Sequence, residues 1–223
     1  MLQNGLFITG DGSHSIESKQ FGVPYHSRNG AVQETFHVFI NAALHPQSEE
    51  KQTLSILDIG FGTGLNALAT LIESQKLALI IDYTAVEAFP LPLAVVEQLN
   101  YIDQLQLPDL ADSFIEMHSS SWGQKHQISN QFGLTKLKQR FESLQFNEAF
   151  DIIYYDAFAP NAQPELWDEP IMKNMYNALK ANGVLTTYCA KGAFKRTLKK
   201  IGFQVEAIPG PPGKREMTRA WKR

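Results

Sequence analysis

The distribution of hydrophobic and polar residues predicts alternating strands and helices from residue 54 onward. Short apolar runs rich in β-branched or aromatic residues alternate with longer segments whose apolar residues recur at helical spacing. Strands that alternate with helices form a mostly parallel sheet with helices on both faces, so we expect an α/β fold with a seven-stranded sheet. The predicted strands are residues 54–59, 80–87, 132–137, 150–156, 184–188, 203–208 and 216–221. The predicted helices are residues 65–74, 93–105, 110–117, 141–144, 170–180 and 193–200.

The first 53 residues do not follow this alternation. Polar stretches that contain glycine are typical of turns. Residues 31–44 carry apolar positions near helical spacing, and Pro46 predicts the end of that helix. We interpret residues 1–53 as a small N-terminal cap on the substrate side of the protein, and residues 54–223 as its main domain.

The composition is that of a soluble globular protein, with 43% hydrophobic and 19% charged residues. The chain has no apolar run of the roughly 20 residues needed to cross a bilayer, and its start does not resemble a signal peptide. A single cysteine excludes an internal disulfide framework, and the six histidines lack the spacing of metal ligands. We therefore expect a cytoplasmic protein without a metal ion and without a membrane partner.

Charge is distributed unevenly along the chain. The formal net charge is −3, yet residues 191–223 contain ten of the 20 Lys and Arg residues and only two of the 23 acidic ones. A basic segment beside an acidic body is typical of a protein that contacts a polyanion with one face. The alternative is a solvated amphipathic helix at residues 195–200.

Three glycines, Gly60, Gly62 and Gly64, follow the first predicted strand and precede a helix. Glycine tolerates positive φ and lets the backbone approach a ligand, and the helix presents free N–H groups to the turn. This arrangement favours a nucleotide-like cofactor over a plain turn. Leu65 stands where the dinucleotide fingerprint has its last glycine, which disfavours an NAD-dependent oxidoreductase. Asp58, inside the strand, can bond either the loop amides or the cofactor.

Two acidic residues end the next buried strands, and ligands of such sheets bind at the carboxyl ends of the strands. Glu87 lies about 23 residues after Gly64, near the offset at which an acid binds ribose hydroxyls. Asp156 would face the reactive end of the cofactor, with Phe158 and Pro160 excluding water. The alternatives are an exposed strand-end charge for Glu87 and a structural acid for Asp156. No Ser/His/Asp constellation suggests hydrolysis.

Four motifs together resemble one known family. They are Leu-Asp-Ile-Gly-Phe-Gly-Thr-Gly-Leu-Asn at residues 57–66, Asp-Ala-Phe-Ala-Pro at 156–160, Pro-Glu-Leu-Trp at 164–167 and Gly-Lys-Arg-Glu-Met at 213–217. In this order they resemble the methyltransferase half of the bifunctional bacterial enzyme that completes 5-methylaminomethyl-2-thiouridine in tRNA. The resemblance covers nearly the whole chain. The oxidoreductase half of that enzyme is absent, so the chain resembles a stand-alone form of the methyltransferase.

The resemblance implies a Rossmann-like class I S-adenosylmethionine-dependent methyltransferase. Its reaction would convert 5-aminomethyl-2-thiouridine to 5-methylaminomethyl-2-thiouridine at the tRNA wobble position, and a separate enzyme would supply the aminomethyl group. The cofactor-binding residues so implied are Asp58, Gly60, Gly62, Gly64, Asn66, Glu87 and, near the adenine, Gln139. Gln139 stands in a segment where the family tends to carry an acid.

Asp156 would lie at the reacting centre, orient the substrate amine and accept a hydrogen bond from it as positive charge grows. Tyr25 and Phe158 would stack on the uridine beside Pro160. Lys214 and Arg215 would contact phosphates of the anticodon stem-loop.

Two other functions remain open from the residues. One is an aminopropyltransferase-like protein or a small-molecule amine methyltransferase, which has the same kind of sheet and an acid after the fourth strand. The other is a non-catalytic RNA-binding module.

Overall fold

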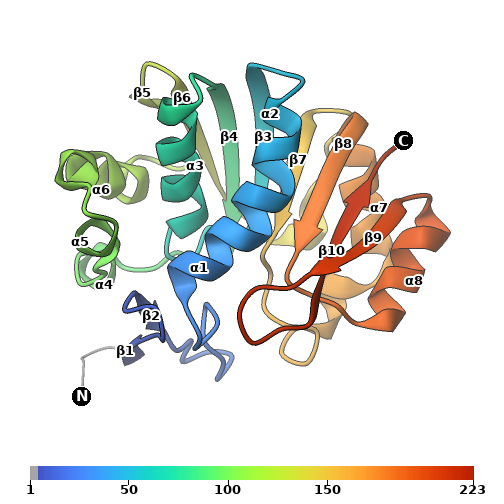
Figure 1. The fold of residues 1–223 in the computed structure, drawn as a ribbon, viewed down its shortest axis with the longest axis horizontal. Helices are drawn as coiled ribbons and strands as arrows, with labels where there is room; N and C mark the ends of the chain where they lie inside the picture. The colour runs from blue at the N-terminus through green and yellow to red at the C-terminus, as the bar shows by residue number, and fades with distance from the viewer. Residues whose placement is uncertain (1–4) are drawn as a thin grey trace.

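The computed structural model describes residues 5–223 and contains one large sheet between two layers of helices (Figure 1). The sheet has eight strands in the order β5-β6-β4-β3-β7-β8-β10-β9. Strands β3, β4, β6, β7 and β8 run parallel, and β10 is antiparallel to both of its neighbours. The α/β prediction is confirmed. The strands are β3 (Thr53–Ile59), β4 (Ile80–Glu87), β5 (Lys125–Ser129), β6 (Phe132–Lys138), β7 (Phe150–Tyr155), β8 (Leu179–Thr187), β9 (Gln204–Pro209) and β10 (Glu216–Trp221).

The predicted number of seven strands is wrong because the sequence pattern did not indicate β5. This short strand pairs antiparallel with β6 at one edge of the sheet, with Lys125 opposite Thr135 and His126 opposite Leu134. Only Ile128 of its five residues is buried. An edge strand with one buried side chain has too few apolar positions to show the alternation by which strands are predicted.

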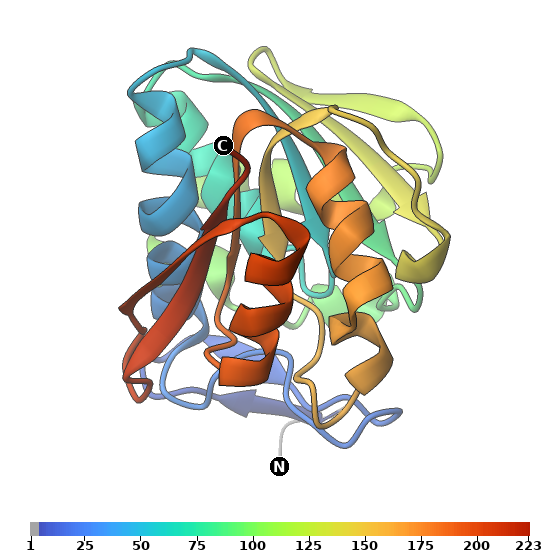
Figure 2. The ribbon, with the colours of Figure 1, turned by 90° about the vertical axis from the view of Figure 1, so that its right-hand side faces the viewer.

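Helices cover both faces of the sheet (Figure 2). Side chains of β3 point alternately to the two faces of the sheet. Leu54 and Ile56 pack in one hydrophobic core, and Leu57 and Ile59 pack in the other. Both faces of the central strands are therefore apolar, as a parallel sheet requires. The first core includes α3 (Leu65–Lys76) and the N-terminal helix, and the second includes α7 (Glu169–Ala178) and α8 (Gly192–Ile201).

The N-terminal helix continues past Pro46, contrary to the prediction. It begins as α1 (Ala31–Thr35), continues as a π-helix over Phe36–Leu44 and ends as α2 (His45–Ser48). The change from π-helical to α-helical hydrogen bonding places Pro46 in the first turn of α2. A proline is tolerated there because no intrahelical hydrogen bond requires its missing N–H.

The helix predicted for residues 93–105 is divided into two short helices, α4 (Leu93–Val96) and α5 (Tyr101–Leu105). Val96, Leu99 and Tyr101 are all buried in the first core, so the apolar spacing continues across the break. A further helix, α6 (Ala111–Ser119), and three single turns of 3-10 helix at residues 108–110, 141–143 and 164–167 complete the described chain. Among residues 5–223, no helix is long and apolar enough to cross a membrane.

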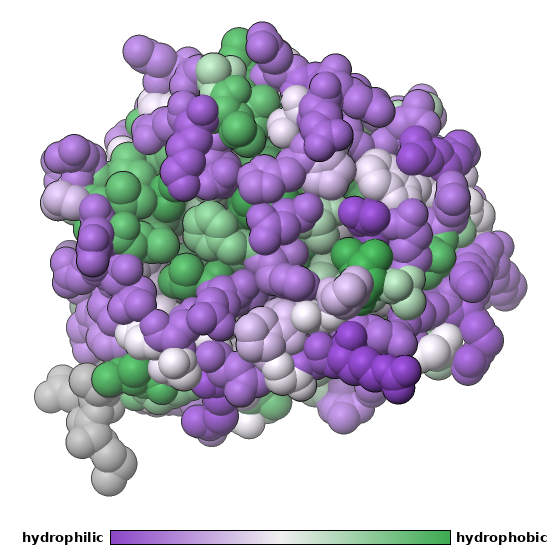
Figure 3. All heavy atoms as spheres, viewed as in Figure 1, coloured by the Kyte–Doolittle hydropathy of each residue, from purple (hydrophilic) through white to green (hydrophobic). Residues whose placement is uncertain are grey.

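The N-terminal segment lies along the edge where the parallel strands end (Figure 1). It contains a two-stranded hairpin, β1 (Leu6–Ile8) and β2 (His14–Ile16), followed by the bridge between Glu17 and Pro24. The loop from Pro24 to Gly30 then leads into α1. The face of the molecule drawn in Figure 3 is mostly hydrophilic, and its hydrophobic areas are separated by polar side chains.

Candidate active site

The glycine loop joins β3 to α3 in a conformation that favours glycine. Gly60 and Gly62 have φ angles of 102° and 48°. A Cβ atom on Gly60 would lie 2.8 Å from the carbonyl oxygen of Asp156, and one on Gly62 would lie 3.0 Å from the Tyr25 ring. The loop therefore touches both the segment after β7 and the N-terminal segment.

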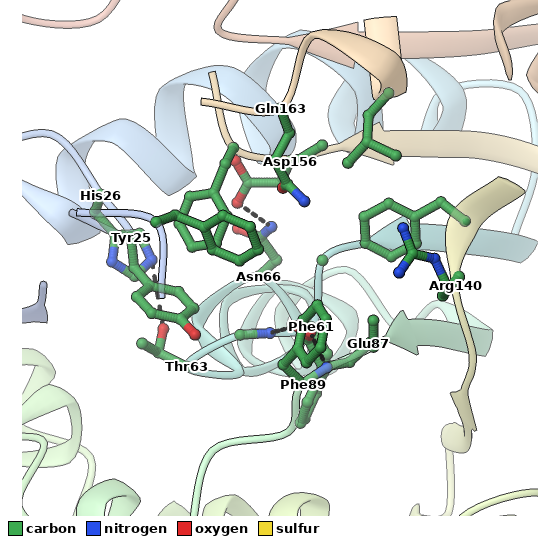
Figure 4. A pocket seen from close by; sticks show the side chains of 18 of the residues that line it. Tyr25, His26, Phe61, Thr63, Asn66, Glu87, Phe89, Arg140, Asp156 and Gln163 are labelled. Atoms are coloured by element: carbon green, nitrogen blue, oxygen red, sulfur yellow. Dashed lines mark hydrogen bonds between the residues drawn. The ribbon is translucent and has the colours of Figure 1, made fainter. Parts of the chain in front are cut away.

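A pocket lies against this loop. Its walls come from the glycine loop, the end of β4, residues 140–142, the segment after β7 and the N-terminal segment (Figure 4). Its place at the carboxyl edge of the sheet agrees with the topological rule for ligand binding in such folds.

Glu87, the last residue of β4, is buried at the wall of this pocket. Its Oε2 accepts a hydrogen bond from the Gly62 N–H at 3.0 Å, and its Oε1 accepts one from the Phe89 N–H at 2.8 Å. Burial raises the pKa of this carboxyl group, although the backbone hydrogen bonds oppose the shift. Each carboxylate oxygen has a second lone pair, so Glu87 can still accept from ligand hydroxyls.

The side-chain amide of Asn66 lies between the carboxyl groups of Asp58 and Asp156 and donates a hydrogen bond to each. The Nδ2 of Asn66 donates to Asp156 Oδ2 at 3.0 Å (Figure 4). It also donates to Asp58 Oδ1 at 3.4 Å. The Thr35 hydroxyl donates to the Oδ1 of Asn66 at 3.2 Å, and the Tyr83 hydroxyl donates to Asp58 Oδ2 at 2.8 Å. Asp58 is fully buried, whereas Asp156 is half-buried and lines the pocket.

The electrostatics of this end of the pocket favour a positively charged ligand. Burial and the nearby acids Asp58 and Glu34 raise the pKa of Asp156 well above its usual value, against the opposing effects of Asn66 and Lys214. Burial raises the pKa of Asp58 to about 7. A cation that enters this end of the pocket stabilises the ionised form of both carboxyl groups, so its binding there is favourable.

Aromatic rings line the mouth of the pocket. The Phe158 ring lies 5.0 Å from both the Phe21 and the Tyr25 ring, centre to centre, and Phe21 lies 6.0 Å from Phe89. Tyr25 and Phe158 were selected from the sequence as stacking residues, but Phe21 and Phe89 were not. Both lie in irregular segments, so no periodicity could have indicated that they face the pocket.

The structure brings many of the predicted site residues to one pocket but not all of them. Seven line it, namely Tyr25, Gly60, Gly62, Asn66, Glu87, Asp156 and Phe158. Gly64 lies at the start of α3, and Asp58 lies behind the pocket wall, where it contacts Tyr83 and Asn66. Neither of them lines the pocket.

The remaining predicted residues lie elsewhere. Gln139 does not line the pocket, and its neighbours Arg140, Phe141 and Glu142 do. Pro160, Lys214 and Arg215 line a separate open groove. Within residues 5–223, no group of three or more His, Cys, Asp or Glu side chains could hold a metal ion.

The fold and the site define a Rossmann-like protein that binds a nucleotide-type cofactor. A solved structure described as MNMC2 from Aquifex aeolicus has the same fold, with a TM-score of 0.74 at 23% sequence identity. The superposition covers 96% of this chain and 69% of that chain.

Residues 106–223, more than half of the chain, match a family described as S-adenosyl-L-methionine-dependent methyltransferase. The chain belongs to this family of class I methyltransferases, and S-adenosylmethionine is its cofactor. The predictions of fold class, enzyme class and cofactor are confirmed.

Curated relatives include the tRNA 5-methylaminomethyl-2-thiouridine biosynthesis bifunctional proteins MnmC of several bacteria. The protein of Ralstonia nicotianae is 30% identical over 210 residues, which are 90% of this chain and 32% of that protein. The protein of Nitrosospira multiformis is 30% identical over 218 residues, which are 91% of this chain and 34% of that protein. The chain thus spans about a third of the length of these relatives.

The pocket fits S-adenosylmethionine on its own geometry. Gly60 and Gly62 carry no side chain toward the pocket that they line, which suits close approach of a ligand to the backbone. The buried Glu87 carboxyl group at the pocket wall suits the ribose hydroxyls of such a cofactor.

Proposed function

We propose that this protein transfers a methyl group from S-adenosylmethionine to the primary amine of 5-aminomethyl-2-thiouridine at the tRNA wobble position. The relatives named for this biosynthesis match over about 90% of the chain, which supports the proposal. The observation that carries it is the Asp156 carboxyl group, which has one oxygen clamped by Asn66 while the residue faces a pocket with an aromatic mouth.

The bound cofactor would supply a methyl group already activated on a sulfonium. The protein must then present a neutral amine in line with that methyl group. An alkyl ammonium has a pKa near ~10, so the free amine is a minor form in water. The apolar rings of Phe21, Tyr25 and Phe158 disfavour the charged form, since they replace water around it.

Asp156 would orient the amine through its Oδ1, because Asn66 holds its Oδ2 at 3.0 Å. As the nitrogen becomes positive, the carboxylate stabilises the charge and accepts the proton or passes it to water. Asp58 contacts Asn66 and Tyr83, so its role would be to position Asn66.

The cofactor would lie on Gly60 and Gly62, with its ribose hydroxyls on Glu87. We propose that residues 140–142, which line the pocket beyond Glu87, contact the adenine in place of Gln139. Figure 4 shows the Arg140 side chain on the same side of the pocket as Glu87.

The substrate would be the anticodon stem-loop of tRNA, and its uridine would stack on Tyr25 and Phe158. A separate enzyme would supply the aminomethyl group. Such a substrate agrees with the cytoplasmic location expected from the sequence.

The test is nucleoside mass spectrometry after incubation of the protein with labelled S-adenosylmethionine and tRNA that carries 5-aminomethyl-2-thiouridine. We expect label in 5-methylaminomethyl-2-thiouridine and not in free amines of small molecules. The variant Asp156→Asn should lose about 10²–10⁴-fold in turnover, the usual contribution of a general base, and should bind the cofactor nearly as well as before.

Glu165→Gln is the matched control because Glu165 is an exposed acid that does not line the pocket. It should turn over at the normal rate. Turnover of Asp156→Asn close to that of the control would remove Asp156 from the reaction. Labelling of small amines in preference to tRNA would overturn the proposed substrate.

A further inference from the structure

An open groove lies next to the pocket on the other side of the segment that follows Asp156. Three segments line it, namely residues 159–160, residues 188–191 and residues 214–216. We propose that this groove binds a phosphodiester group next to the methylated nucleotide, and that Lys191 and Arg215 are the residues that bind it. This inference rests on the proposed tRNA substrate.

The position of the groove fits a nucleotide whose base enters the pocket. Phe158 lines the pocket, and its neighbours Ala159 and Pro160 line the groove. The Tyr188 hydroxyl donates to the carbonyl of Ala157 at 2.8 Å, which fixes this shared segment to the end of β8. A sugar-phosphate backbone that crosses the segment would therefore leave the base on one side and a phosphate on the other.

The three cations of the groove differ in whether a carboxylate already pairs with them. Lys214 is engaged, because its Nζ lies 2.6 Å from Glu34 Oε1 and 4.2 Å from the centre of the Tyr188 ring. Lys191 and Arg215 are exposed, and within the described chain neither forms an ion pair with a carboxylate. The Lys191 Nζ instead donates to the side-chain oxygen of Asn161.

The acid of the groove does not cancel these charges. Glu216 is paired with Lys195 at 2.5 Å, so its charge is already compensated. The groove is left with the two positive charges of Lys191 and Arg215. An Arg guanidinium beside a Lys ammonium suits a phosphate, since the guanidinium can donate two parallel hydrogen bonds and the ammonium adds a point charge.

Lys214 has a different task, which is to hold the wall of the groove. The ion pair with Glu34 joins the turn between β9 and β10 to α1. Two further hydrogen bonds reinforce this connection, from the Asn29 amide to the Pro212 carbonyl at 3.0 Å and between the His37 ring and the Pro209 carbonyl at 2.8 Å. The groove thus has a fixed wall on which Arg215 is presented.

The test compares two double variants that remove the same charge. Lys191→Ala/Arg215→Ala changes the groove. Lys199→Ala/Arg223→Ala removes two other exposed cations that form no carboxylate pair in the described chain and do not line the groove. Binding of a fluorescent anticodon stem-loop RNA is measured at several salt concentrations, and cofactor binding is measured by calorimetry.

We expect the groove variant to bind the RNA at least about 10-fold more weakly, with a slope of log K against log salt reduced by about one. The control variant should stay within about threefold of the wild type, and both variants should bind the cofactor normally. Equal losses in both variants would indicate a diffuse basic face and overturn the inference, as would no loss in either.

Failure of the proposed function would look different. A wild-type protein that binds the RNA through the groove but does not methylate aminomethyluridine would overturn the reaction and leave the phosphate site standing. Competition by inorganic phosphate as strong as that by the RNA would show that the groove takes a free anion and not a phosphodiester.

Discussion

At the scale of single residues, the site depends on close contacts between segments distant in the chain. Gly60 makes one of these contacts, since a Cβ atom on it would lie 2.8 Å from the carbonyl oxygen of Asp156. The Asn66 amide joins Asp58 and Asp156, which lie at the ends of two neighbouring strands. A change of one atom at either position alters the placement of the carboxyl group that is proposed to contact the substrate.

Gly60→Ala should therefore weaken cofactor binding by at least about 10-fold. The new Cβ would lie 2.8 Å from the Asp156 carbonyl, at a φ of 102° that side chains rarely adopt. Calorimetric titration with S-adenosylmethionine measures the effect. Gly123→Ala is the control, because it has a φ of 78° but meets no atom within 4 Å. A similar affinity for both variants would show that the contact with Asp156 is not important.

At the scale of elements, β7 has an ion-paired acid near its start and the proposed catalytic acid just after its end. Asp156 follows its carboxyl end, while Asp151 near its start is bonded by Lys51 at 2.6 Å, by Lys180 at 2.9 Å and by the Ser55 N–H at 2.9 Å. Burial alone would raise the pKa of Asp151, but these partners outweigh it and lower the pKa below the usual value. The cluster joins β7 to β3 and β8 at the edge away from the pocket.

Asp151→Asn should lower the free energy of unfolding at pH 7 by about 1–2 kcal/mol, a modest value because both lysines are more than a third exposed. A lowered pKa contributes stability that is present above the unfolded-state pKa of about 3.9 and is lost as the pH falls through the folded-state value. The difference from wild type should thus narrow below about pH 4. Urea unfolding across this range measures it.

The control for this experiment is Asp109→Asn, at an exposed acid that lies away from the cluster. It should leave stability unchanged at every pH. A deficit of Asp151→Asn that stayed constant down to pH 3 would mean that the ion pairs are not its cause. Cofactor affinity should be normal in both variants.

At the scale of the whole molecule, the N-terminal part of the chain meets the turn between β9 and β10 beside the site. They are bound to each other by Glu34 and Lys214, and the N-terminal segment contributes Phe21 and Tyr25 to the pocket. The pocket is therefore built from the N-terminal segment and from the segments at the carboxyl edge of the sheet. A ligand that fills it contacts segments that would separate on unfolding.

S-adenosylmethionine should accordingly raise the melting temperature. At about 100 times its dissociation constant a ligand adds about 2.7 kcal/mol, which corresponds to about 5–10 °C for a chain of this size. NAD at the same concentration should give no shift, since Leu65 replaces the last glycine of the dinucleotide fingerprint. Differential scanning fluorimetry provides the comparison. A shift with NAD of similar size would contradict the assigned class of ligand.

The sequence by itself determined the features that depend on neighbouring residues. β4 and β10 have the predicted bounds, because β-branched and aromatic runs between turn residues are a local signal. The glycine turn and the acidic residues Glu87 and Asp156 were found for the same reason, since a strand end is visible in the order of residues. The rule for parallel sheets then placed all three at one edge.

Only the tertiary structure decided which of these groups touch and in what state of charge. The contact between Lys214 and Glu34 spans 180 residues, and the shared amide of Asn66 depends on the packing of α3 against β3 and β7. The raised pKa of Asp156 arises from burial and from acids brought near it by folding. Such effects depend on distances in space, which folding sets. The order of residues along the chain does not specify these distances.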